Sequence, residues 1–87
     1  MQFVKGMVVR SKKGHDKGRF YVVCSADNNS AALTDAQSKT ADKPKIKNLI
    51  HLAPTKTVLS EEQLGSDDEI RRILADFNGR VRLSKGG

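Results

Sequence analysis

The sequence predicts a mainly β fold: a compact barrel of about five short strands, followed by one C-terminal α-helix. Two β-branched apolar runs near the N-terminus flank a short loop of glycine and charged residues, which is the pattern of a hairpin. Polar turns separate several further short apolar runs, whereas the last third of the chain carries apolar residues at helical spacing. With 87 residues, the chain has room for one domain with a modest core.

The first two strands are expected at 7–11 and 19–26, joined by a loop over 12–17. Gly14 and Gly18 adopt positive φ at little cost, so they suit a tight or bulged connection. Asp16 is expected to brace this turn through hydrogen bonds towards Gly18. The neighbours Phe20 and Tyr21 point to opposite faces of a strand, which predicts that one is core and the other is free to stack on a base.

The later strands are expected to be shorter or more exposed. An Asp-Asn-Asn-Ser turn at 27–30 precedes a strand at 31–34, and a polar loop follows at 35–42. One half-buried strand is then expected over 43–52, with Pro44 at a sheet edge and Pro54 as its end. Its alternation predicts two faces: Lys43, Lys45 and Lys47 outward, and Ile46, Ile50 and Leu52 inward. A last short strand is expected at 57–59.

The last third of the chain predicts a helical segment over 60–79 that packs on the barrel. Ser60–Gly65 resembles one capped turn, and Ser66–Glu69 has the pattern of a capping box. Gly79 is a suitable stop, and residues 80–87 are then expected to form a flexible basic tail. One apolar stripe follows at helical spacing: Ile70, Ile73, Leu74 and Phe77. This stripe is expected to cover an open edge or end of the barrel, and binding of a partner is the alternative.

Charge is distributed unevenly along the chain. Residues 1–59 contain eleven Lys and Arg against four Asp and no Glu, for a net charge of +7, whereas residues 60–87 have a net charge of −1. Such a bias predicts an acidic partner, most simply a phosphate backbone. A surface that is merely soluble with a positive excess is the alternative.

Several classes of protein are disfavoured by the composition. The single cysteine, Cys24, permits no internal disulfide and no zinc site, and it is expected to be a small buried core residue. No apolar run approaches the ~20 residues of a membrane span, and Met1–Gly6 lacks the apolar core of a signal peptide, so a cytoplasmic location is expected. We find no catalytic constellation, and we expect a protein that is not an enzyme and has no cofactor or metal.

The segment Gly6-x-Val8-Val9-x-Ser11-x-x-Gly14-x-Asp16-x-Gly18, followed by Phe20, Val22 and Val23, resembles the KOW motif. Residues 45–55 and 68–71 resemble later parts of small bacterial KOW-domain RNA-binding proteins, which are similar to archaeal- and eukaryotic-type large-subunit ribosomal proteins. The resemblance implies an SH3-like barrel and binding to structured, ribosomal RNA. It also implies a role in translation or ribosome assembly, with ribosomal proteins as possible neighbours and a monomer when free. His15 departs from the family, because a basic residue often occupies this loop position.

The predicted RNA-binding residues form two basic sets. The primary contacts are expected from the hairpin loop, with glycines that let the backbone approach the RNA: Lys12, Lys13, Gly14, Lys17, Gly18 and Arg19. Arg10 and the exposed His15 flank them. The second set is Lys43, Lys45, Lys47 and Lys56, and the sequence leaves open whether it shares a face with the first. His51 is expected to be half-buried. The alternative function is a protein-interaction module of SH3-like type that docks on the transcription or translation machinery.

Overall fold

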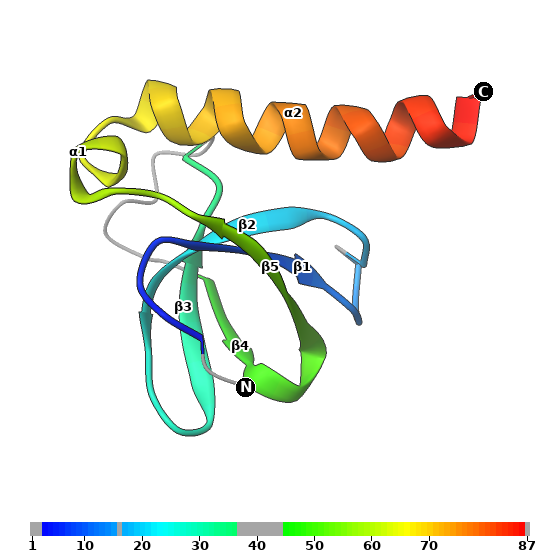
Figure 1. The fold of residues 1–87 in the computed structure, drawn as a ribbon. Helices are drawn as coiled ribbons and strands as arrows, with labels where there is room; N and C mark the ends of the chain where they lie inside the picture. Colours follow the sequence, from blue (N-terminus) through cyan, green and yellow to red (C-terminus); the bar gives the residue numbers. More distant parts are fainter. Residues whose placement is uncertain (1–2, 16, 37–44, 87) are drawn as a thin grey trace.

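The fold is a five-stranded antiparallel sheet with a long helix across one side (Figure 1). The computed structural model describes residues 3–15, 17–36 and 45–86. The strands are β1 (Met7–Ser11), β2 (Phe20–Ala26), β3 (Ser30–Thr34), β4 (Lys45–Asn48) and β5 (Leu52–Val58). A 3₁₀ helix η1 (Leu49–His51) precedes β5, and the helices α1 (Glu61–Leu64) and α2 (Asp67–Gly86) follow it. The sheet order is β4-β3-β2-β1-β5, so the predicted mainly β class with a C-terminal helix is confirmed.

The strand predicted over 43–52 is interrupted, and this prediction is wrong. The side chain of Asn48 accepts a hydrogen bond from the backbone N–H of Ile50 (3.0 Å), which starts η1 and ends β4. Asparagine competes for nearby backbone groups in this way and so favours turns. The expected end at Pro54 is also wrong, because Pro54 lies inside β5 opposite Val9. Since β5 is an edge strand, the missing N–H of proline leaves no ladder bond unmade.

The two faces predicted for β4 are only partly right, because Lys45 is exposed as predicted but Ile46 is exposed as well. Lys45 pairs with Leu33 and Ile46 pairs with Ala32, and residues directly opposite each other share a face. Lys45 therefore lies on the sheet face of the buried Leu33 but is itself exposed, while Ile46, which was predicted to point inward, is 64% exposed. An alternating pattern is compatible with either face, and the register decides between them. Lys43 lies outside the described residues.

The core consists of two apolar clusters on opposite faces of the sheet. The first lies between the sheet and α2, where Val8 and Val22 meet Ile70 and Leu74. The second gathers side chains from β1, β2, β3 and the start of β5: Val9, Tyr21, Val23, Ala31, Leu33 and Leu52. Because successive residues of a strand face opposite ways, the apolar run in β2 supplies both clusters.

The helical segment follows the sequence signals at its start but not at its end. Ser60 and Gln63 form a reciprocal capping box on α1, and Ser66 Oγ accepts from the N–H of Glu69 (3.3 Å) at the start of α2. The predicted stripe packs inward, with Ile70 and Leu74 buried and Ile73 and Phe77 partly so. The predicted stop at Gly79 is wrong, because α2 continues to Gly86. A glycine inside a helix costs only about 1 kcal/mol, so one such residue need not end it.

Three side chains of β2 differ from expectation or refine it. Tyr21 is buried in the second cluster, and the ring of Phe20 lies 5.0 Å from that of Phe77 on α2. Both rings thus pack within the domain, whereas the sequence predicted that only one would. Cys24 is half-buried rather than a core residue, and this burial raises the pKa of its thiol.

Candidate nucleic-acid interface

The loop between β1 and β2 is fixed by backbone hydrogen bonds. The N–H of Ser11 donates to Arg19 O (2.9 Å), and the N–H of Gly18 donates to Ser11 O (2.8 Å). A third bond, from the N–H of Lys17 to Gly14 O (3.2 Å), closes the tip. The two glycines have φ of 97° and 91°, which confirms the conformation predicted for Gly14 and Gly18. The predicted brace, Asp16, lies outside the described residues.

Ser11 anchors the base of this loop, and the sequence analysis missed its role. Its side chain is completely buried, and its Oγ donates a hydrogen bond to Lys13 O (3.1 Å). A buried hydroxyl needs such a partner, and here the partner is the loop's own backbone. The position of Lys13 is therefore set from beneath, while its side chain remains outside. A serine at the end of an apolar strand was the only signal in the sequence.

The loop presents its basic side chains to solvent. Those of Lys12, Lys13, Lys17 and Arg19 are all exposed, as is that of His15 at the tip. An added Cβ at Gly18 would meet nothing within 4 Å, so the backbone here is open to an approaching ligand. A surface with several cations and an accessible main chain suits a polyanion.

Arg10 and Lys45 lie on opposite faces of the sheet, beside the base of the loop. Arg10 is exposed and pairs across strands with Phe20, whose ring packs on α2, so Arg10 faces the helix side. Lys45 lies on the other face, with its Nζ 5.6 Å from the centre of the Tyr21 ring. Cations are attracted to the face of an aromatic ring, which accounts for this position.

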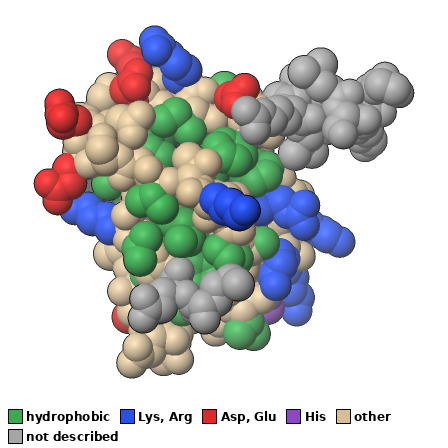
Figure 2. Space-filling model, viewed as in Figure 1, with side chains coloured by type: hydrophobic (Ala, Val, Ile, Leu, Met, Phe, Trp, Pro, Cys, Tyr) green, Lys and Arg blue, Asp and Glu red, His purple; other side chains and the backbone are tan. Residues whose placement is uncertain are grey.

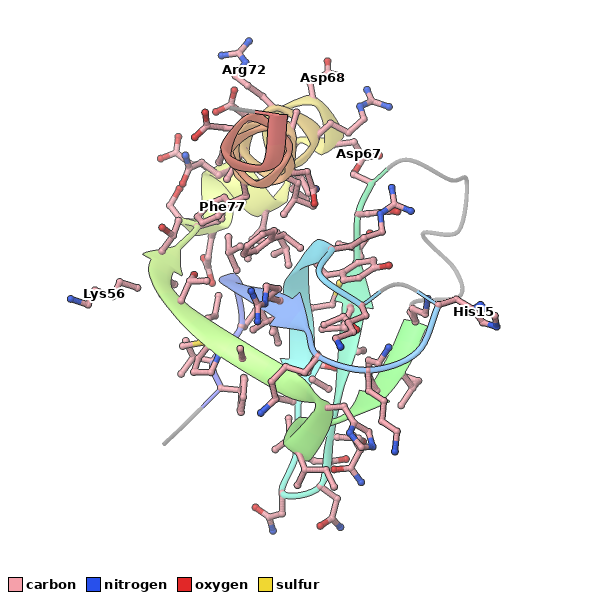
Figure 3. All side chains as sticks on the ribbon, turned by 90° about the vertical axis from the view of Figure 1, so that its right-hand side faces the viewer. His15, Lys56, Asp67, Asp68, Arg72 and Phe77 are labelled. Carbon is pink, nitrogen blue, oxygen red and sulfur yellow. The ribbon has the colours of Figure 1, made fainter. Side chains whose placement is uncertain are left out.

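The second basic set divides in space. Lys47 shares β4 with Lys45 and is half-buried opposite Ala31. Lys56 extends from β5 on the side of the molecule away from His15 (Figure 3). Thus Lys45 and Lys47 lie on the strand next to η1, whereas Lys56 does not belong to the same surface.

The 3₁₀ helix η1 links β4 to the basic loop. The N–H of Lys12 donates to His51 O (2.8 Å), so the first residue of the loop is bonded to the last residue of η1. His51 itself is half-buried, as predicted. The loop and the end of β4 therefore lie on the same side of the domain. On the face drawn in Figure 2, a group of Lys and Arg side chains lies at the right, on the side of the β1–β2 loop, and acidic side chains lie over α1 and the start of α2.

A residue of α2 holds the start of β2. Asn78 accepts a hydrogen bond through Oδ1 from the N–H of Phe20 (3.3 Å) and donates one through Nδ2 to Leu74 O (2.9 Å). Because Phe20 directly follows Arg19, this contact fixes the second base of the loop. Its partners are 58 residues apart, so no local pattern could have indicated it.

Together these residues form a fixed, basic hairpin loop at one end of a small antiparallel sheet. No protein-family model matches the chain, and no curated protein matches it at a significant level. Across the described ranges, no three His, Cys, Asp or Glu residues are grouped so that they could hold a metal ion. In the same part of the chain, no helix combines the length and apolarity needed to cross a bilayer.

Proposed function

We propose that this chain is a non-enzymatic RNA-binding protein that contacts structured, ribosomal RNA through the β1–β2 loop. The observation that carries the proposal is the exposure of Lys12, Lys13, Lys17 and Arg19 on a loop whose backbone is hydrogen-bonded to itself and to η1. Such a loop holds its charges in place before binding, so little conformational entropy is lost on contact with RNA.

The loop contacts the phosphate backbone rather than reading a base sequence. Each phosphate contact releases condensed counterions, which gives a log–log salt slope of about −0.7 to −0.9 per contact. Structured RNA presents phosphates and riboses at varied angles, and it is recognised largely by shape. Gly14 and Gly18 leave the loop backbone uncovered, so its N–H groups add to the charge of the lysines.

The fold itself supports membership of the SH3-like KOW class. The last strand returns to pair with the first, and the second apolar cluster takes side chains from four of the five strands. A sheet of this order with a shared cluster on one face is compatible with the curvature of a small barrel. Under this reading the protein acts in the cytoplasm in translation or ribosome assembly, with ribosomal RNA as its partner and ribosomal proteins as neighbours.

The test compares two charge reversals of equal size. Lys12→Glu with Lys13→Glu is expected to lower affinity for structured RNA at least about tenfold and to flatten the salt slope by about 1.5. Lys5→Glu with Lys56→Glu makes the same change in net charge at exposed positions outside the loop, and it is expected to have a much smaller effect. Equal losses in the two variants would show that net charge alone matters. Binding to duplex DNA with the same affinity would indicate a non-specific nucleic-acid binder.

A protein-interaction module remains the second proposal, because exposed aliphatic side chains lie on both edge strands. Ile46 on β4 and Val58 on β5 are 64% and 51% exposed, and within the described part of the chain each of these strands pairs on one side only. Exposed apolar groups of this kind can mark a protein contact. A pull-down from lysate before and after RNase treatment separates the two proposals. Partners that persist without RNA support the protein module, whereas partners lost with the RNA support RNA binding.

A further inference from the structure

We propose that η1 is a second part of the RNA interface and that Ile50 packs against an unpaired base. The inference rests on the proposed function of the neighbouring loop and narrows its substrate to RNA with a bulged or looped-out nucleotide. Ile50 is 70% exposed, more than any other large apolar residue among those whose side chains the structure describes, which are 3–15, 17–36 and 45–78. It is one residue away from His51, which is hydrogen-bonded to the basic loop.

The exposure of Ile50 is imposed by the fold around it. The N–H of Leu49 donates to Asn29 O (2.9 Å) in the β2–β3 turn, and Asn48 caps the N–H of Ile50 (3.0 Å). The bond from Lys12 to His51 O holds the other end of η1. Two separate segments and the cap of η1 itself therefore fix this one turn, while Leu49 packs against the second cluster. With its backbone held and its neighbour turned inward, Ile50 is directed outward.

The charges around η1 favour an anionic ligand. Lys12 is bonded to one end of η1, and Lys47 lies two residues before its start. The nearby acidic group in the β2–β3 turn, Asp27, already accepts hydrogen bonds from the N–H groups of Asn29 and Ser30. An exposed aliphatic side chain on an element that follows Lys47 and is bonded to Lys12 suits a ligand that is both charged and partly apolar.

An unpaired nucleotide combines those properties. A paired RNA helix offers phosphates and hydroxyls on its accessible surfaces, which give an isoleucine little to pack on. A base turned out of the helix exposes its flat apolar face next to its own phosphate. Packing of an aliphatic side chain on that face makes no hydrogen bond to the base edges, so it does not depend on which base is present. Lys12 and Lys47 would hold the flanking phosphates while Ile50 covers the base.

The experiment uses the full chain and two RNA hairpins that differ by one bulged nucleotide. We expect the native protein to prefer the bulged hairpin by about five- to tenfold, and Ile50→Ser to lose this preference without weaker binding to the paired hairpin. Val58→Ser is the matched control, since Val58 is also an exposed aliphatic residue but lies opposite Met7, at the other end of β1. It should retain the preference.

The outcomes separate this inference from the function on which it rests. If native protein and Ile50→Ser bind the two hairpins equally, while Lys12→Glu with Lys13→Glu binds neither, the inference is wrong and the loop proposal stands. If the charge reversal leaves RNA binding intact, the loop proposal itself fails. A photoreactive thiouridine at the bulge gives a second readout, since its crosslink should map to residues 48–52 of the native protein. A crosslink confined to other segments contradicts a base contact at Ile50.

Discussion

The two ends of β1 differ in how tightly the chain closes around them. At the N-terminal end, the N–H of Gly6 donates to Val23 O and its carbonyl accepts from Leu59, both at 2.8 Å. A Cβ added there would lie 2.6 Å from Leu59 O, whereas one added at Gly18 beyond the other end would meet nothing within 4 Å. Both glycines have a φ of 91°. The same backbone conformation therefore serves close packing at one end and an open binding surface at the other.

This difference extends to the elements beyond each end. Gly6 lies against Leu59 and Leu64, which lead into the helices with acidic first turns. Apolar contacts hold this end of the molecule together. At the loop, backbone hydrogen bonds hold the chain, and the side chains project into solvent. Substitutions at the first end should therefore change stability, and those at the loop should change binding.

The largest effect on stability is expected from Leu74→Ala. Leu74 is 2% exposed in the cluster beneath α2, and truncation of a buried leucine costs about 2–5 kcal/mol because it leaves a cavity. Urea unfolding measures the change. Arg72→Ala on the same helix is the control, since its ion pair with Glu69 is on the surface and should matter by less than about 1 kcal/mol. RNA affinity of the folded fraction should not change in either variant, and a matching loss would contradict the separation.

The next largest effect on stability is expected when Gly6 or Gly18 is replaced by alanine. Gly6→Ala combines an unfavourable positive φ with a clash against backbone, so we expect a loss of about 2–4 kcal/mol. Gly18→Ala has the same φ without the clash and should cost about 1–2 kcal/mol. Thermal unfolding of the two variants under the same conditions measures the difference. Equal losses would mean that conformation alone, and not the close approach to Leu59, makes Gly6 necessary.

Local patterns in the sequence were sufficient to predict features that depend only on residues close together in the chain. Gly14 and Gly18 were predicted from the conformational freedom of glycine, and the capped turn at Ser60–Gly65 from its residue pattern. The sheet face of each β4 residue was not, since the register with β3 places the exposed Lys45 on the face of Leu33, with its Nζ over the Tyr21 ring. In the same way, Pro54 is tolerated in β5 because the strand lies at an edge.

The candidate site likewise could be predicted only where it depends on local sequence. The charges of the loop can be read from the sequence, because exposed lysines need no partner. The buried Ser11 and the contact between Asn78 and Phe20 depend on groups brought together by the fold. These residues fix the base of the loop, so they belong to the site although they carry no charge.

A smaller effect on stability is expected from Asn78→Ala. Asn78 lies on α2 but holds the base of the β1–β2 loop, so it links the helix to the binding surface. The substitution removes the acceptor for the N–H of Phe20 and should destabilise the protein by about 1 kcal/mol. Because this bond holds the residue after Arg19, amide hydrogen exchange at Phe20 and in the loop should increase. Asn78→Asp keeps an acceptor and should preserve protection at Phe20. Unchanged exchange in the alanine variant would show that the packing of Phe20 on Phe77 suffices to hold the loop.

The smallest effect is expected at the β2–β3 turn, where an acidic residue organises the backbone. Hydrogen bonds from the N–H groups of Ser30 and Asn29 lower the pKa of Asp27 below its ordinary value, because they stabilise the carboxylate. A group whose pKa is lowered by folding contributes stability above its unfolded pKa, and that contribution is lost as the pH falls through the folded pKa. The stability difference between the native protein and Asp27→Ala should therefore be constant near neutral pH and shrink in acid.

Since the Asp27 carboxylate is fully exposed, the stability difference should be small and should show first as faster amide exchange at Asn29 and Ser30. A difference that does not depend on pH would mean that the turn is held by its backbone alone, from Asp27 N–H to Ser30 O. In that case the turn would be fixed as the β1–β2 loop is, by main-chain bonds, and the bond that holds Leu49 against it would survive acid.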